Sequence, residues 1–541
     1  MSPPGKRDGC TSSATSQQPS MKMSKIVTNP SASYKSESRF SKIGRGDMAR
    51  FALFGLIGSL ALLYPWWVLG GLAIAAAVWL CWEAVVQVRR ANLELWQVLA
   101  LVGVSGYMLL NYGFENLTIH VGGFPIIISY GMMYAALGLA IINHRDQIKR
   151  AMKEPAVLCM LGLLVFSLGH LAIDVPSYGL WALRDSSMCL DGMFMLLGML
   201  WAMKPNSLKF MGKWLLTLFV LNMLYSFTLP WGEKIWSWSP ESGVFLSVPI
   251  LGNFNGTGDL LLAGALFCIC AGVYVLSRPS WLMLFLALAQ FLGVAISQVR
   301  RMYLATVVVI VILALLGETK KYAKLLILLP AAVVVILLVT TVGGFQISGR
   351  IGVINLEFFR DHIRSMSDSD GTPGSSVESR FIMADEALGH FRAHPVLGEG
   401  FGLPLLTIID ETNGSVTRMP HNSSLTYLAR LGVVGFAIWI AFHYCMIKRF
   451  VYAFLRRRRH LDDERVSAFV LWLGLFYVLF MIGSLVEAAF EFPSGAIPFY
   501  FFMGFAMGLI RWHLSDKKKS EYRLDGLESG VEKAQLQEQT L

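Results

Sequence analysis

Apolar runs long enough to cross a membrane recur along this chain from Phe51 to Trp512. Most of these runs have about 17–25 residues, the length of helix that spans a hydrocarbon core of roughly 30 Å. Hydrophobic residues make up 55% of the 541 residues, and charged residues make up only 15%. A soluble domain carries about a quarter charged residues. The pattern therefore predicts an all-α polytopic membrane protein.

The apolar runs indicate about 12–14 transmembrane helices. The first two runs follow each other closely, so twelve spans are the alternative to fourteen, and either even number places both chain ends on the same side. The expected spans are 51–65, 66–87, 95–111, 123–143, 155–173, 187–203, 212–230, 258–277, 280–298, 302–316, 323–342, 424–446, 466–487 and 494–512.

Lysine and arginine residues distinguish the two faces of this arrangement. Cytoplasmic loops carry an excess of both residues, and with fourteen spans all the basic clusters fall on one face. The same distribution accounts for the net charge of +10, which therefore does not indicate nucleic-acid binding. The basic clusters lie at 89–90, 145–153, 204–213, 320–324, 448–465 and 517–519.

One loop on the opposite face is long enough to fold. Apolar residues in 378–393 recur at helical spacing, so this loop should contain an amphipathic helix. The N-terminal tail is too polar to bury a core, which predicts disorder. The expected segments are a cytoplasmic tail (1–50), an N-terminal transmembrane bundle (51–342), the outer, periplasmic loop (343–423), C-terminal transmembrane helices (424–512) and a second cytoplasmic tail (513–541).

The sequence predicts no bound metal and no other cofactor. Six of the seven cysteines lie in or beside apolar runs, and no CxxC motif occurs. His170 and Asp174 are four residues apart on one helix face, but no further ligand lies near them in the sequence. The acidic residues of the apolar runs are expected to pair within the bundle or to line a cavity: Asp191, Asp259, Glu487 and Glu491.

His421 is the first candidate for chemistry. It follows Pro420 and precedes Asn422 and two serines, which are good N-cap residues for the next helix. The positive end of a helix favours an anion and disfavours imidazolium, so the ring should be able to accept a proton. The alternative is that His421 only caps the helix.

Three arginines of the outer face are the second set of candidates: Arg184, Arg300 and Arg301. Positive charge is disfavoured on this face, and guanidinium groups pair bidentately with phosphate oxygens, so together they would bind a diphosphate. For Arg184 the alternative is a salt bridge with Asp185 or contact with lipid headgroups.

Three further features have structural interpretations. Arg430 lies about eight residues into its helix, roughly 12 Å from the start, and should face a polar cavity or a charged partner. Gly432 and Gly435 would let a second helix approach closely. The glycine-rich stretch 398–402 reads as a flexible turn.

The order of these residues resembles the O-antigen ligase and Wzy-type polymerase superfamily. That family's pattern of His-Asn, nine residues and Gly-x-x-Gly is similar to His421-Asn422 followed by Gly432-Val-Val-Gly435. Upstream, 378–402 resembles the family's helix and its HP-x-x-G-x-G-x-G segment. Ser297-Gln298-Val299-Arg300 resembles a family helix start, although Val299 replaces a serine, so either Arg300 or Arg301 could be the family arginine. The resemblance covers about 290–440 well.

The resemblance implies a metal-independent, inverting glycosyltransferase of the bacterial inner membrane, with its active site facing the periplasm. It would move a glycan from undecaprenyl diphosphate to an acceptor hydroxyl of lipid A-core or of a growing glycan, among membrane lipids. His421 would take the acceptor proton, and Arg184, Arg300 and Arg301 would neutralise the diphosphate. Asn422, Arg380 and Arg430 would support the site.

Several functions remain open within and outside that family. The motif has the ligase form, which favours an O-antigen ligase over a Wzy-type polymerase or a protein O-oligosaccharyltransferase. A lipid-linked sugar transporter is the alternative of a different class, and a structural scaffold is the third. A cavity on the outer face lined by His421, Arg184 and Arg300 would favour the enzyme, whereas a central cavity open to both sides would favour the transporter.

Overall fold

The computed structural model describes residues 66–121, 124–204, 206–244, 247–254, 256–316, 376–406, 418–460 and 463–512, together with 357 and 360. The predicted tails at 1–50 and 513–541 and the expected spans 51–65 and 323–342 lie outside these residues. Most of the 343–423 loop also lies outside them.

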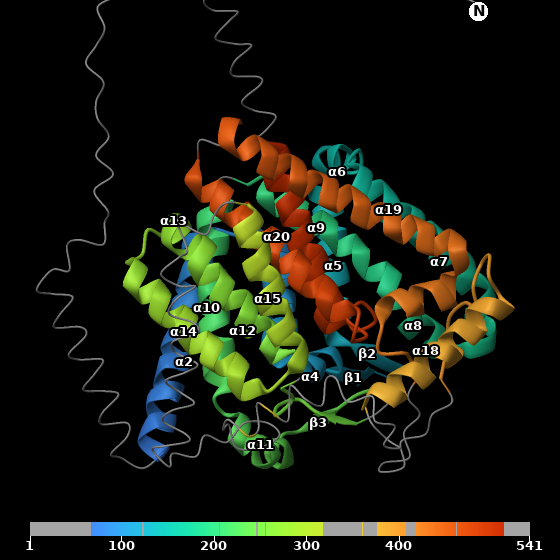
Figure 1. Cartoon of the computed structure of the whole chain (residues 1–541), viewed down its shortest axis with the longest axis horizontal. Helices are drawn as coiled ribbons and strands as arrows, with labels where there is room; N and C mark the ends of the chain where they lie inside the picture. Colours follow the sequence, from blue (N-terminus) through green and yellow to red (C-terminus); the bar gives the residue numbers. More distant parts are fainter. Residues whose placement is uncertain are drawn as a thin grey trace, which may run out of the picture. The chain divides into compact units, whose positions relative to one another are not determined.

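The described chain is almost entirely helical, which confirms the predicted fold class (Figure 1). Its helices are α2 (Trp66–Arg90), α3 (Leu95–Leu110), α4 (Tyr112–Glu115), α5 (Ile128–Asn143), α6 (Arg145–Ala151), α7 (Pro155–Tyr178), α8 (Leu180–Leu190), α9 (Met195–Ala202), α10 (Ser207–Ser226), α11 (Gly232–Trp238), α12 (Thr257–Phe267), α13 (Val273–Leu276), α14 (Ser280–Ser297), α15 (Arg300–Leu315), α18 (Ser376–Ala393), α19 (Ser423–His460) and α20 (Glu464–Ser484), and a final helix covers Pro493–Trp512.

Seven of the described helices are long and apolar enough to cross a membrane, and α3 and α5 are shorter apolar helices. Several expected spans are not single regular helices. One of them, 258–277, contains a π-helical segment at Cys268–Gly272 that joins α12 to α13. In 123–143 the first residues form strand β2 (Phe124–Ile127), which pairs antiparallel with β1 (Thr118–Val121), so the helix begins at Ile128. In 187–203 a 3-10 segment at Asp191–Phe194, with Asp191 and Gly192 buried, separates α8 from α9. A second small hairpin joins β3 (Glu241–Ser242) to β4 (Val248–Pro249).

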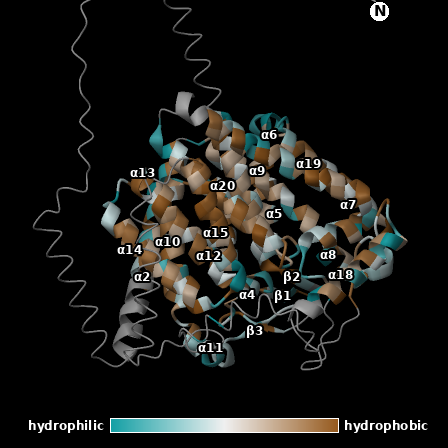
Figure 2. Cartoon of the chain, viewed as in Figure 1, coloured by the Kyte–Doolittle hydropathy of each residue, from teal (hydrophilic) through white to brown (hydrophobic). Residues whose placement is uncertain are grey.

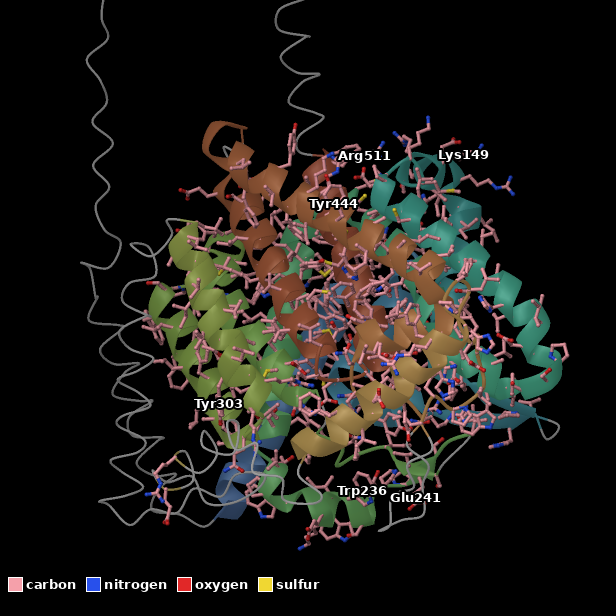
Figure 3. The ribbon with its side chains drawn as sticks, turned by 45° about the vertical axis from the view of Figure 1, so that its right-hand side comes forward. Lys149, Trp236, Glu241, Tyr303, Tyr444 and Arg511 are labelled. Atoms are coloured by element: carbon pink, nitrogen blue, oxygen red, sulfur yellow. The ribbon has the colours of Figure 1, made fainter. Side chains whose placement is uncertain are left out.

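Polar residues gather at two opposite ends of the bundle, and the helices between them are hydrophobic (Figure 2). Figure 3 shows Lys149 and Arg511 at one end and Trp236 and Glu241 at the other. At the first end Glu154 accepts hydrogen bonds from Arg449 at 2.5 and 2.8 Å. Loops predicted on opposite faces of the membrane therefore lie at opposite ends of the bundle.

The helix α19 is broken near its start. Gly432 has φ +60° inside it, which interrupts the helical hydrogen bonds and leaves backbone groups without helical partners. The 395–402 loop supplies those partners, so the break and the loop form one unit. Four backbone hydrogen bonds join them: Glu399 N–H to Ala429 O, Gly400 N–H to Arg430 O and Val433 N–H to Pro395 O, each at 2.9 Å, and Val434 N–H to Val396 O at 3.3 Å.

This arrangement corrects two of the sequence interpretations. The 398–402 stretch is not a flexible turn, because its backbone is hydrogen-bonded to α19 and Phe401 is fully buried. Gly432 does not serve the approach of another helix. A Cβ atom at this position would lie 2.4 Å from the carbonyl oxygen of Val396.

We predict that Gly432→Ala strongly destabilises the protein. A positive φ costs a non-glycine residue about 1–3 kcal/mol, and the clash with Val396 adds to that cost. Gly169→Ala is the matched control, because nothing lies within 4 Å of its added Cβ on the regular helix α7. Thermal unfolding in detergent should show a large fall for Gly432→Ala and no loss for Gly169→Ala. Equal stability of the two variants would contradict this account of the break.

Candidate functional site

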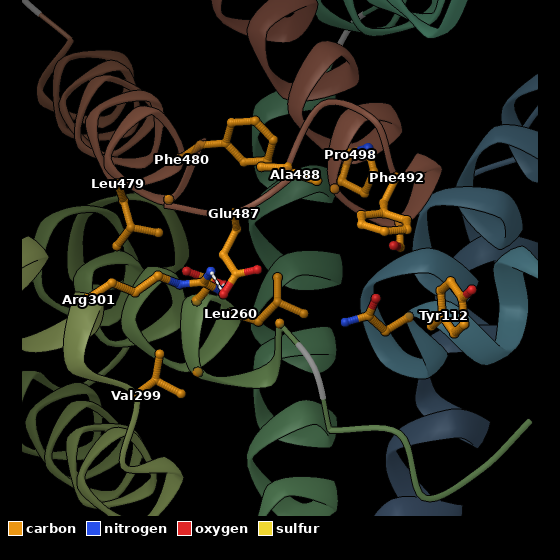
Figure 4. Close-up of a pocket in the computed structure, with 18 of the residues that line it drawn as sticks. Tyr112, Leu260, Val299, Arg301, Leu479, Phe480, Glu487, Ala488, Phe492 and Pro498 are labelled. Carbon is orange, nitrogen blue, oxygen red and sulfur yellow. Dashed lines mark hydrogen bonds and ion pairs between the residues drawn. The ribbon is translucent and has the colours of Figure 1, made fainter. Parts of the chain in front are cut away.

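A cavity of about 480 Å³ opens at the end of the bundle where α19 begins. Its walls come from α3 and α4, from the starts of α12 and α15, from α20, and from the turn that leads into the final helix (Figure 4). Its volume falls within the range of about 300–1,000 Å³ typical of small-molecule sites. The charged or titratable residues that line it are Asp259, Arg301, His421 and Glu487, with Tyr107 and Tyr112.

Arg301 is the centre of the charged end of this cavity. Its guanidinium lies 2.6 Å from the carboxylate of Asp259 and 3.1 Å from that of Glu487. One cation between two carboxylates is held in one position and carries less net positive charge towards a ligand. Asp259 and Glu487 therefore line a cavity and also pair within the bundle, as the sequence indicated.

His421 lies beside the same carboxylate. Its Nδ1 is 3.5 Å from Glu487, and 43% of its side chain is exposed. Burial alone would raise the pKa of Glu487, but contact with His421 and the charge of Arg301 lower it, and the net shift is downward. Glu487 is therefore ionised near neutral pH. It can orient the ring through Nδ1 and leave Nε2 for a ligand.

The predicted arginines do not all reach the cavity. Arg301 lines it, whereas Arg300, the first residue of α15, and Arg184 on α8 do not. Arg184 lies over the ring of Trp181, 5.1 Å from its centroid. The sequence left open which residue of the adjacent pair corresponds to the family arginine, and of the two residues Arg301 is the one that lines the cavity.

The three expected supporting residues have different positions. Asn422 caps α19, because its side-chain oxygen accepts a hydrogen bond from Leu425 N–H at 3.2 Å. Arg380 is exposed on α18 and acts on Glu487 through its charge. Arg430 is fully buried and lies outside the cavity, so it is an internal cation that does not face the cavity.

Arg430 holds the 395–402 loop in place. Its guanidinium lies 2.8 Å from Asp185 and donates hydrogen bonds to the carbonyls of Gly400 at 2.9 Å and Leu403 at 3.2 Å. The same carboxylate of Asp185 accepts from Gly402 N–H at 3.1 Å. The partner that the sequence required for Arg430 is thus Asp185, which the sequence had associated with Arg184.

The pair predicted as weak metal ligands also belongs to this loop. His170 lies 3.9 Å from Asp174, and Asp174 accepts a hydrogen bond from Phe401 N–H at 2.7 Å. Within the described ranges no three residues of the types His, Cys, Asp and Glu gather to hold a metal ion.

Sequence reasoning missed the wall of the cavity that lies opposite Arg301. Asn111, Tyr112, Phe492 and Ser494 line it, and Glu115 lies behind Ser494, from which it accepts hydrogen bonds. Glu115 is the last residue of α4 and is half-buried, and nothing in the sequence distinguishes it from an ordinary carboxylate at a helix end. Removal of this carboxyl from water raises its pKa to about 7, although Ser494 and Arg184 oppose the shift.

We predict that Glu115→Gln stabilises the protein at alkaline pH. The folded-state pKa of Glu115 lies above its ordinary value of 4.5, so its ionisation opposes folding as the pH rises from about 4.5 through 7. The neutral amide avoids this penalty. Thermal unfolding should show a higher midpoint than wild type at pH 8 and little difference near pH 4.5. A benefit of the substitution that does not depend on pH would refute the assignment.

Comparison with known families agrees with the motifs. Residues 263–440 match the family model of the O-antigen ligase, a range that includes Arg301, the 395–402 loop, His421 and the break at Gly432. No curated protein matches the chain. The match confirms the resemblance found in the motifs, since residues 263–440 are similar to the O-antigen ligase domain.

Proposed function

We propose that this protein transfers a glycan from undecaprenyl diphosphate to an acceptor hydroxyl, as an O-antigen ligase at the periplasmic face of the bacterial inner membrane. The observation that carries the proposal is the contact of His421 with Glu487 beside Arg301, in a cavity at the end of the bundle. The match of residues 263–440 to the O-antigen ligase family gives this cavity its chemical context.

His421 acts as the general base in this reaction. Its Nε2 takes the proton of the acceptor hydroxyl while the hydroxyl oxygen forms a bond to the anomeric carbon. The bond between that carbon and the phosphate oxygen breaks, and its electron pair leaves with the carrier diphosphate. Attack opposite the leaving group inverts the anomeric centre. Glu487 holds Nδ1 and stabilises the imidazolium that forms, as the aspartate of a hydrolase triad does.

The arginines divide the work of neutralising the diphosphate. Arg301 faces the cavity, but its charge is already shared by Asp259 and Glu487. A diphosphate therefore needs further positive charge, and Arg300, Arg184 and Arg380 are the candidates to supply it. In this scheme Arg301 mainly orients Glu487 and the leaving oxygen.

The cavity contains His421 and Arg301 but neither Arg184 nor Arg300, so it has only part of the lining expected of the enzyme. Its place at one end of the bundle favours an enzyme over a transporter, and the family match favours a ligase or a polymerase. Deletion of the gene separates these two. We expect full-length polymer to accumulate on the carrier, because a ligase acts on finished chains. Single repeat units on the carrier would indicate a polymerase, and an unchanged pool of lipid-linked glycan would exclude both.

We predict that His421→Ala lowers turnover of purified lipid-linked donor on the order of 10²–10⁴-fold. His421→Asn should be equally poor, because an asparagine side chain cannot take the proton. The cap of α19 does not depend on position 421, since Asn422 already provides it. Glu487→Gln should reduce the rate about tenfold or more, since it keeps the shape but removes the charge that stabilises imidazolium. His120→Ala, an exposed change on β1, is the control and should retain activity. Near wild-type turnover by His421→Asn would reject the role of base.

A further inference from the structure

The cavity has two chemically different ends. Figure 4 shows Arg301 and Glu487 on one side of it and Tyr112, Phe492 and Pro498 on the other. The first end holds the ions that the proposed transfer uses. The second end has aromatic rings and uncharged polar groups, among them Asn111. The proposed mechanism assigns no role to this second end.

Asn111 is held there in a strained backbone conformation. It joins α3 to α4 with φ +48° and ψ −122°, a region that residues other than glycine avoid. Such strain persists where the surroundings enforce it, and it often marks a functional site. Gly256, at φ +78°, lies next to the amide, because a Cβ on this glycine would lie 2.5 Å from Asn111 Nδ2. Two unusual backbone positions thus meet to place one amide.

The Asn111 amide takes part in no hydrogen bond with the residues that the structure describes, although it lines the cavity. An amide offers two donors and an acceptor. An apolar ligand such as a lipid chain would leave these groups without partners, at a cost of about 1–3 kcal/mol. The side-chain amide of Asn111 is therefore suited to a ligand with hydroxyl groups.

Aromatic side chains flank this amide. The rings of Tyr112 and Phe492 meet edge to face with centroids 5.9 Å apart, and they come from α4 and from the turn before the final helix. Ser494 lies beside them and is fixed by Glu115, which accepts from its N–H at 3.4 Å and from its hydroxyl at 3.0 Å. Apolar ring faces beside a few fixed polar groups are typical of a site that orients a small ligand.

We infer that Asn111, Tyr112 and Phe492 form a sugar-binding subsite that holds one pyranose ring of the substrate. The C–H face of the ring packs on the aromatic side chains, and a hydroxyl pairs with the Asn111 amide. This inference rests on the proposed function and adds the groups that select the sugar. The ring belongs either to the donor, next to the diphosphate, or to the end of the acceptor.

The test uses Asn111→Gly and Phe492→Leu in the full-length protein. Glycine removes the amide and also accepts the positive φ, so this variant should fold at least as well as wild type. Asn92→Gly is the matched control. Asn92 is also an asparagine at a helix end with positive φ, +47°, but it is exposed and lies outside the cavity.

The probe is the free glycan released by mild acid from the lipid-linked donor that accumulates in the deletion strain. Titration calorimetry should show binding about tenfold weaker for Asn111→Gly and for Phe492→Leu, the loss expected for one good contact, and unchanged for Asn92→Gly. In turnover assays KM should rise and kcat should change little. A rise in KM for the lipid-linked substrate assigns the ring to the donor, and a rise for the acceptor assigns it to the acceptor.

The subsite and the transferase activity fail in different ways. If both cavity variants bind the free glycan and turn over as wild type does, the subsite is refuted while the proposed function stands. If wild-type protein turns over no lipid-linked glycan and the deletion strain accumulates none, the proposed function is refuted, and the subsite that rests on it is refuted with it.

Discussion

The start of α19 depends on one buried ion pair. Arg430 and Asp185 are both removed from water, and such a pair is tolerated only where further hydrogen bonds satisfy its remaining groups. Here the backbone next to the pair supplies several of these bonds, through the carbonyls of Gly400 and Leu403 and the N–H of Gly402, while Asp185 Oδ1 and Arg430 Nε have no hydrogen-bond partner among the described residues. The loop in turn satisfies the carbonyls and N–H groups that the break at Gly432 releases. Loss of Asp185 would leave Arg430 buried without a carboxylate, whereas loss of Arg430 would leave Asp185 with Arg418, 3.5 Å away, as its remaining cation.

This buried network differs from the charges in the cavity. The guanidinium of Arg430 donates its hydrogen bonds to backbone carbonyls and is shielded from water. His421 and Glu487 are each 43% exposed, so both can exchange protons with a ligand or with solvent. Arg301 lies between these extremes, with 16% of its side chain exposed and two carboxylates beside it. The chain thus uses one arginine to fix its fold near the site and another to face the site.

The sequence predicted the class of the fold but not its irregularities. Long apolar runs identify most helices, because span length and hydropathy are local properties. They could not indicate that 124–127 forms a strand, or that α19 breaks at Gly432, because both depend on backbone partners distant in sequence. For the same reason the sequence offered Asp185 only as an alternative partner of its neighbour Arg184. Its actual partner, Arg430, is 245 residues away.

The candidate site likewise contains residues that the sequence could identify and residues that it could not. His421, Arg301, Asp259 and Glu487 could be identified because ionisable residues are rare and costly in or near apolar runs. Asn111, Tyr112 and Phe492 could not, since asparagine and aromatic residues are ordinary at the ends of membrane helices. Only the fold shows that Asn111 is strained and that its amide faces a cavity. Charged chemistry was therefore visible in the sequence, whereas the neutral groups suited to recognising a sugar appear only when the helix ends meet.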